Sequence, residues 1–263
     1  EQAYAMRLFE PSGDRVVATR DLDRALPRIR ALLALSEDLD ADLGRHGAGQ
    51  TGPLRVGYAT AQVAGPILSR LPQELPGITL STCVAATQDL LQMLDASEID
   101  AAFVVGRKPP SRLTRAHVAT SRIVLAVPAT HPLAGTGPVA WSTVSDLPLI
   151  QRETASGTRR LFEAAASTAE AALDTRLVLG SWGAIAAMVR AGFGAGVGLD
   201  AEVRQSDDLV AVPIADPSLK ADHFLVCLPD CARAPAVHHL FKLAREDVTR
   251  HRSPFLPAPG SQG

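Results

Sequence analysis

Two different spacings of apolar residues divide the chain into an amino-terminal arm and a longer region of alternating strands and helices. Between Asp21 and Leu43, apolar side chains recur every three to four residues, with charged residues between them. That period is typical of a helix with one apolar stripe, and at about 1.5 Å per residue the helix is roughly 35 Å long. A lone helix of this length needs a surface on which to bury its stripe, and a copy of itself is a natural partner. The residues expected in that dimerisation seam are Leu26, Ile29 and Leu33.

The residues before this helix predict a β-hairpin. Residues 11–14, Pro-Ser-Gly-Asp, are turn formers, and the short run Arg15-Val16-Val17 that follows is β-prone. Pro27 stands inside the apolar stripe, where it allows a kink or a late helix start. A hairpin joined to one helix cannot bury a core of its own, which raises the question of what flanks it.

After a glycine-rich linker over residues 45–53, the pattern changes to strands alternating with helices. An apolar run such as residues 101–105 is typical of a strand covered on both faces. The strands predicted in this way are 54–58, 78–83, 101–105, 123–128, 147–150, 175–179, 195–199 and 223–228. The predicted helices are 63–71, 87–94, one from Ser156, one from Ser181, and 235–250.

Two sets of strand–helix units in one chain predict two α/β lobes. The strand at 123–128 leads into the second set, and the strand at 223–228 leads back to the first. Two crossings of this kind would form a hinge with a cleft between the lobes. The boundaries expected are about 54–127 and 224–252 for lobe I and about 128–223 for lobe II. The tail over 253–263, rich in Pro, Gly and Ser, is expected to be disordered.

Composition narrows the classes of protein that the chain can be. The apolar content of 46% is ordinary for a globular protein, and a net charge of -2 argues against a protein that coats nucleic acid along its whole surface. A small DNA-binding end is still allowed. No apolar run reaches the roughly 18 residues that a membrane span requires, and no signal-peptide core is present. Three cysteines give no disulfide framework, which favours a reducing cytoplasm.

Five stretches, in this order, resemble the LysR-type transcriptional regulators. RLFEPSGDRVVAT resembles the wing of that family, and GPLRVGYATAQVAGPILSRL resembles the first strand and helix of its effector domain. LLQMLDASEIDAAFV places Asp100 in the family's D-x-A position, and LAVPATHPLA fits the entry into the second lobe. SWGAIAAMVRAGFGAGVGL resembles the helix, glycine turn and strand of that lobe. The linker helix departs from the family's Thr-x-Ala-Gly start, and Ala85-Ala86 replaces the Gly-Ser pair that members often carry, which removes one hydroxyl from the expected ligand site.

The resemblance implies a two-lobed effector domain of the periplasmic-binding-protein type over 54–252. Residues 1–20 would then be the remnant of a winged helix-turn-helix domain, and 21–44 the linker and dimerisation helix. It further implies a DNA-binding regulator that forms dimers or tetramers, contacts RNA polymerase and uses no cofactor besides a small-molecule effector. In the remnant wing, Arg7 and Arg15 are the residues expected to contact the DNA backbone.

Polar residues at four predicted helix starts are the candidate effector site. Backbone N–H groups are unpaired at a helix start, so they attract an anion such as a carboxylate. Thr60 or Thr87 could equally be a simple helix cap, and it is the family layout that implies a role in the cleft. The expected site residues are Thr60, Ala61, Gln62, Thr87, Thr154, Ser156, Gly157, Thr158, Ser181 and Trp182.

Other functions have weaker signals. Ser156 lacks the G-x-S-x-G elbow and no base stands at a fixed spacing from it, so an enzyme is not predicted. Cys227 and Cys231 with His238-His239 match no strong zinc pattern, so no metal site is predicted. A two-lobed solute-binding protein is the main alternative, although it would need no wing or leucine-striped arm. A domain that only oligomerises is the third.

Overall fold

A computed structural model describes residues 7–12, 15–45 and 53–250 of the 263-residue chain. The expectations for residues 1–6, for most of the linker and for the tail lie outside these residues, as does the side chain of Arg15. No helix in the described ranges is long and apolar enough to cross a membrane.

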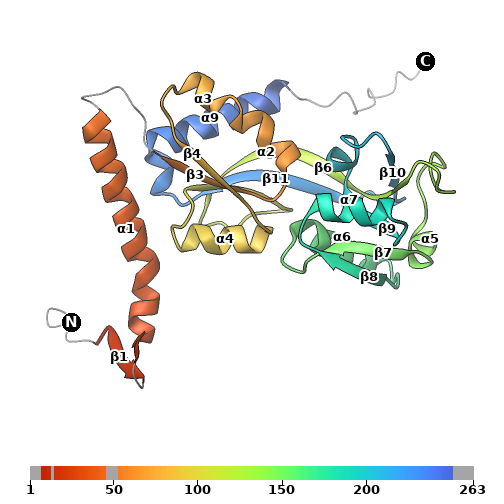
Figure 1. Cartoon of the computed structure of the whole chain (residues 1–263), viewed down its shortest axis with the longest axis horizontal. Helices are drawn as coiled ribbons and strands as arrows, with labels where there is room; N and C mark the ends of the chain where they lie inside the picture. Colours follow the sequence, from red (N-terminus) through yellow and green to blue (C-terminus); the bar gives the residue numbers. More distant parts are fainter. Residues whose placement is uncertain (1–6, 13–14, 46–52, 251–263) are drawn as a thin grey trace, which may run out of the picture.

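The arm consists of the predicted hairpin and helix. Strands β1 (Phe9–Ser12) and β2 (Arg15–Ala18) pair antiparallel, and α1 runs over Arg20–Arg45. Thr19 joins them, because its hydroxyl donates to the carbonyl of Arg7 at 2.9 Å and accepts the N–H of Leu22 at 3.4 Å. The helix therefore begins before Pro27, and the predicted late start is wrong. Figure 1 shows α1 alongside one end of the main body.

One sheet of nine strands runs through the rest of the described chain. Its order is β4-β3-β5-β11-β6-β9-β7-β8, and β10 pairs with β6 beyond this path. The strands are β3 (Leu54–Tyr58), β4 (Leu80–Val84), β5 (Ala101–Gly106), β6 (Thr114–Pro128), β7 (Pro148–Arg152), β8 (Asp174–Leu179), β9 (Ala195–Leu199), β10 (Leu209–Pro213) and β11 (Lys220–Cys227). Parallel pairing in each outer part and antiparallel pairing in the centre divide the sheet into two lobes.

Helices cover both faces of this sheet. They are α2 (Ala61–Leu68), α3 (Leu71–Glu74), α4 (Thr87–Asp95), α5 (Trp141–Ser145), α6 (Gly157–Thr168), α7 (Trp182–Arg190), α8 (Asp200–Val203) and α9 (Pro235–Arg250), with a 3-10 turn at Cys231–Arg233. We define lobe I as β3, β4 and β5 with α2, α3, α4 and α9, and lobe II as β7 to β10 with α5 to α8. In lobe I, α2 and α9 lie on one face and α4 on the other (Figure 1).

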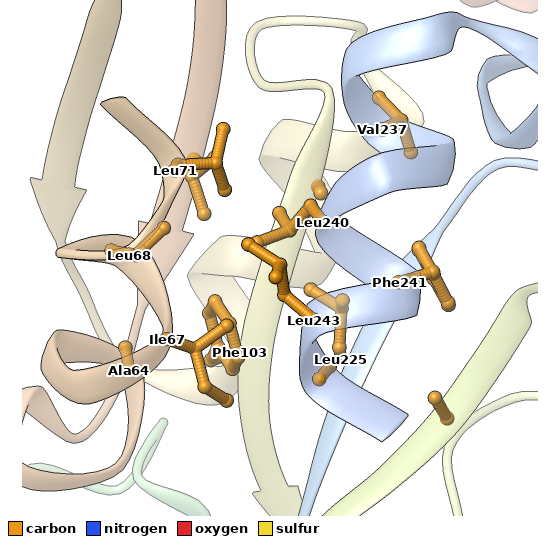
Figure 2. Close-up of a cluster of buried hydrophobic side chains, with 14 of the residues drawn as sticks. Ala64, Ile67, Leu68, Leu71, Phe103, Leu225, Val237, Leu240, Phe241 and Leu243 are labelled. Atoms are coloured by element: carbon orange, nitrogen blue, oxygen red, sulfur yellow. The ribbon is translucent and has the colours of Figure 1, made fainter. Parts of the chain in front are cut away.

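The core of lobe I forms where α2 and α9 meet over the sheet. Ile67 and Leu71 point from the α2 and α3 side toward Leu240 and Leu243 of α9, and Phe103 of β5 lies between them (Figure 2). All five side chains are at most 2% exposed. The apolar periodicity of both segments predicted these helices, and their mutual packing explains why α9, distant in sequence, belongs to lobe I.

Strands β6 and β11 cross between the lobes as an antiparallel pair. Fifteen residues make β6 about 50 Å long, so its first half contributes to the core of lobe I and its second half to that of lobe II. The sequence predicted only its apolar end at 123–128, because residues 114–122 alternate between buried and exposed positions. The two predicted crossings, and the α/β fold class, are confirmed.

A buried polar pair lies at the irregular point of this crossing. The register of β6 and β11 shifts between His223 and Phe224. His223 is 2% exposed, and its Nε2 lies 3.0 Å from the hydroxyl of Ser121. Burial lowers the pKa of His223 to about 4, so the imidazole is neutral at pH 7 and its single hydrogen bond to Ser121 needs no counter-charge.

The remaining differences from the predicted elements have local causes. Residues 63–71 form the two helices α2 and α3 instead of one, with Pro66 inside the first and Pro72 in the first turn of the second. The elements α5, α8 and β10 were not predicted. The helices α5 and α8 are too short, at five and four residues, to show a helical period, whereas the apolar run of β10 was missed.

Asp100 fixes the start of β5 against β3. Its carboxylate accepts the backbone N–H of Arg55 at 2.7 Å and the guanidinium of the same residue at 2.6 and 3.3 Å. Its own N–H donates to the carbonyl of Arg55 at 2.8 Å. The parallel pairing of β3 with β5 begins one residue later, at Val56 and Ala101, so this contact sets the register in which the two strands meet.

We therefore expect Asp100→Ala to lower the free energy of unfolding by about 1–2 kcal/mol, since several hydrogen bonds to a charged group are lost on a partly exposed side chain. Urea unfolding followed by far-UV circular dichroism measures the change. Asp95→Ala is the matched control, because its ion pair with Arg112 lies at the surface, where the two side chains are 42% and 51% exposed. The control should lose less than about 1 kcal/mol, and equal losses in both variants would contradict the proposed role of Asp100.

Candidate functional site

The two lobes meet where the helix starts of α4 and α6 face each other. The N–H of Gln88, in the first turn of α4, donates to the carbonyl of Ala155, just before α6, at 3.2 Å. The guanidinium of Arg160 in α6 donates to the same carbonyl at 3.1 Å and to the side-chain oxygen of Gln88 at 3.4 Å. A helix start of lobe I is thus bonded directly to one of lobe II.

Gly157 allows this close approach. A Cβ atom at this position would collide with the carbonyl oxygen of Val105 at the end of β5 and lie 3.0 Å from the hydroxyl of Thr87. That hydroxyl accepts the N–H of Val105 at 3.1 Å and lies 3.3 Å from its carbonyl oxygen. Thr87 is the first residue of α4 rather than its cap. The alternative that Thr87 serves only as a helix cap is therefore wrong, because its side chain joins α4 to β5.

The other helix starts differ in how their polar side chains are used. Thr60 caps α2 by position and is 4% exposed, but its hydroxyl makes no capping bond. Ser156 is equally buried, and its hydroxyl accepts the N–H of Arg159 at 3.5 Å. Ser181 is exposed and accepts the N–H of Ala184 at 3.3 Å. Simple capping therefore accounts for Ser156 and Ser181 but not for Thr60.

The remaining predicted residues vary in exposure. Thr158 is 7% exposed, and Gln62 and Trp182 are half-buried. Trp182 packs on the backbone of Gly198 in β9, where a Cβ atom would collide with its ring. Ala61 and Thr154 are exposed. Within the predicted set, Thr60, Thr87, Ser156, Gly157 and Thr158 are thus buried, and the others are partly or fully open to solvent.

A buried cation that the sequence analysis missed lies at the end of β7, four residues before Ser156. Arg152 is 8% exposed and pairs with the neighbouring Glu153 at 3.1 Å. Its charge also acts on Glu202 of α8, a carboxyl group whose pKa burial raises to about 6. The carboxyl end of a parallel strand is the usual place for ligand-binding groups in α/β sheets, so the position of Arg152 after an apolar run could have identified it.

A cavity of about 630 Å³ lies between α4 and α6. Only Thr87 and Gly157 of the ten predicted residues line it. Three cationic residues that the sequence analysis did not select also line it: Arg107 and Lys108 after β5, and Arg160 in α6. The signal for the first two was a basic pair directly after the glycine that ends a buried strand.

The cysteines and histidines that offered a faint metal pattern do not form a ligand cluster. Cys227 is fully buried, and burial raises its thiol pKa to about 12. Cys231 is half-buried, and neither residue is in a disulfide. Within the described ranges, no group of three or more His, Cys, Asp or Glu side chains is arranged to hold a metal ion.

Comparison with known proteins gives a family, a curated relative and two similar structures. The family model described as LysR substrate binding domain matches residues 47–249. A probable hydrogen peroxide-inducible genes activator of Mycobacterium avium is 29% identical over 157 residues, which are 57% of this chain and 49% of that protein. The chain thus matches only about half the length of that relative.

Both similar structures share the fold. Full-length OxyR, in a variant from Pseudomonas aeruginosa, is 18% identical with a TM-score of 0.72, over 97% of this chain and 86% of that one. The CcmR regulatory domain of Synechocystis PCC6803, in complex with 2-PG, is 23% identical with a TM-score of 0.66, over 75% of this chain and 98% of that one. At these identities the structural likeness shows the fold alone.

The contact between Gly157 and Val105 generates a test of how the lobes meet. We expect Gly157→Ala to lower the free energy of unfolding by about 1–3 kcal/mol, because the added methyl group must displace either α6 or β5. Thermal unfolding measures the loss. Gly183→Ala is the control: Gly183 lies in the first turn of α7, where a Cβ atom meets nothing within 4 Å, so the substitution should not lower the free energy of unfolding, since alanine favours a helix more than glycine does. Equal melting temperatures for the two variants would show that the lobes do not meet as described.

Proposed function

Because the chain belongs to the LysR substrate binding domain family, we propose that it is the sensing and oligomerising part of a ligand-responsive transcriptional regulator. The observation that carries this proposal is the combination of two lobes joined by crossing strands with a long helical arm. The lobes would bind a small-molecule effector, and the arm would connect them to DNA-binding elements. The curated relative is described as an activator of genes, which supports control of transcription as the output.

We place the effector between the lobes, at the buried helix starts. Thr60, Ser156 and Thr158 are 4%, 4% and 7% exposed, and the hydroxyl of Thr60 is not used as a cap. Helix starts offer unpaired N–H groups and a partial positive charge. Arg152, which pairs with Glu153, adds a buried guanidinium before α6. These features together favour a carboxylate or another small anion as the effector.

The effector would act by favouring one relative position of the lobes. Since the lobes are joined by β6 and β11 and touch at α4 and α6, a ligand between them binds one geometry better than another. A ligand shifts such an equilibrium only by its difference in affinity for the two states, and a tenfold shift requires about 1.4 kcal/mol. The altered geometry would change how copies of the protein pack, and with that the spacing of the DNA-binding elements and access for RNA polymerase.

DNA binding would involve residues before the arm. The hairpin of β1 and β2 corresponds to the proposed wing, and Arg7, which is exposed, would contact phosphates together with Arg15. Phosphate contacts position a protein on DNA without reading its sequence. Base recognition would therefore require a recognition helix in the major groove, which these described residues do not include.

The arm supports a dimer through an exposed apolar face. Leu22 is 5% exposed next to the hairpin, whereas Ile29 and Leu33 are 43% and 59% exposed. Farther along α1 the apolar stripe thus becomes open to solvent. A second α1 helix would cover it, and the two-lobed domain could then form dimers or tetramers. This arm also favours a regulator over a free solute-binding protein, which has no use for it.

We expect Leu33→Asp to weaken self-association by at least about tenfold, because a buried charge in an apolar seam is costly. Sedimentation velocity over a range of protein concentrations measures the effect. Arg24→Ala is the control: it also lowers the net charge by one, and Arg24 is exposed about half a turn away from the stripe. An unchanged oligomer in Leu33→Asp would argue against the seam, while the lobes could still bind an effector.

The effector site is tested by a thermal-shift screen of small carboxylates and aromatic acids, followed by calorimetry with the compounds that stabilise the protein. We expect Thr60→Val and Ser156→Ala to weaken binding by about fivefold or more, as each loses one hydrogen bond of roughly 1 kcal/mol or more. Thr82→Val on the exposed face of β4 is the control and should bind as wild type does. Wild-type affinity in both site variants would refute the effector site, and a screen in which no compound stabilises the protein would contradict the sensing function.

A further inference from the structure

The cavity between α4 and α6 has a positively charged rim. Arg107 and Lys108 follow β5 in lobe I, and Arg160 projects from α6 in lobe II. All three residues are exposed. No Asp or Glu is among the described residues that line the cavity. Three positive charges from two lobes thus converge on one concave surface without a carboxylate among them.

These charges are largely uncommitted within the described part of the chain. Arg107 and Lys108 form no hydrogen bond or ion pair with a described residue, and Arg160 uses one guanidinium nitrogen for its bonds to Gln88 of lobe I and to Ala155 of its own lobe. Asp216 lies close enough to Arg107 for the two side chains to interact electrostatically. Its oxygens, however, already accept the indole N–H of Trp141 at 3.0 Å and the N–H of Ser218 at 2.8 Å.

The inner surface of the cavity is apolar. Leu91 of α4, Val104 of β5 and Phe224 of β11 line it from lobe I and the crossing strands, and Leu161 and Ala164 line it from α6. A volume of about 630 Å³ is within the usual range for small-molecule sites, which combine an apolar lining with a few polar groups. Inorganic phosphate alone would leave most of this lining uncovered.

We propose that this cavity is a second ligand site, separate from the effector site at the buried helix starts, and that it binds an organic anion with an apolar body. The carboxylate or phosphoryl group would lie between Arg107, Lys108 and Arg160, because charge-assisted hydrogen bonds to such groups are the strong ones. The apolar body, an aromatic ring for example, would cover Leu91, Leu161 and Phe224.

Thr87, Val105 and Gly157 contact one another where they line the cavity. Of the predicted effector residues, Thr60, Ser156 and Thr158 do not line the cavity. A ligand in it touches both lobes and the segment after β5, so its binding would stabilise this arrangement of the lobes. The inference stands on the cavity and its charges and does not require the proposed effector site.

Isothermal titration calorimetry of the whole chain with phenyl phosphate, benzoate and inorganic phosphate tests the proposal. We expect saturable binding of both aromatic anions at millimolar concentration or below, and weaker binding of inorganic phosphate, which lacks an apolar body. Arg107→Gln combined with Lys108→Gln should weaken phenyl phosphate binding by about tenfold or more. Ala164→Phe, which fills the cavity without removing a charge, should weaken the binding of both aromatic anions.

The controls separate this site from general charge and from the effector site. Lys242→Gln combined with Arg245→Gln removes two exposed positive charges from α9 and should bind as wild type does. Thr60→Val should leave phenyl phosphate binding unchanged. Circular dichroism confirms that each variant is folded. The proposal is overturned if none of the probes binds saturably, if the Arg107 and Lys108 variant keeps its affinity, or if Thr60→Val or the α9 control loses as much.

Discussion

The antiparallel pair of β6 and β11 is the constraint on which the rest of this structure depends. These two strands belong to both halves of one sheet, so their register decides where every other strand and helix of each lobe is placed. The register shift at His223, with its neutral imidazole next to Ser121, marks the point at which the pair passes from one lobe to the other. A pair of backbones can twist there with little loss of pairing, whereas movement inside either close-packed core would be costly.

The contact between the lobes fixes their relative position across the β6 and β11 pair. Gln88 and Ala155 are bonded through their backbones, and Gly157 lets α6 approach Val105 without a side chain between them. The polar starts of α4 and α6 are brought together for the same reason. The helix starts at which we propose that the effector binds are therefore neighbours of the groups that join the lobes, so a ligand there would be coupled to lobe position.

Positive charge is concentrated on both sides of this contact although the whole chain has a net charge of -2. Arg152 is buried before α6, and Arg107, Lys108 and Arg160 surround the cavity between α4 and α6. Elsewhere many arginines are paired with carboxylates at the surface, as Arg112 is with Asp95 and Arg190 with Asp208. Arg107 and Lys108 differ from these paired surface arginines, because neither forms an ion pair with a described residue, and this difference is the basis for proposing an anion in the cavity.

The sequence by itself determined the α/β class, the arm, most strands and the long helices, because apolar period and helix-start chemistry are local properties. It also selected Thr87 and Gly157, both at helix starts, and the structure places them in the contact between the lobes. Tertiary structure alone decided that residues 114–122 extend β6, since a half-buried strand gives no continuous apolar run. It alone brought Arg107 and Lys108 next to Arg160, which is more than 50 residues away along the chain. The sequence shows the chemistry of each side chain, but only the packing of the two lobes decides which charges share a cavity.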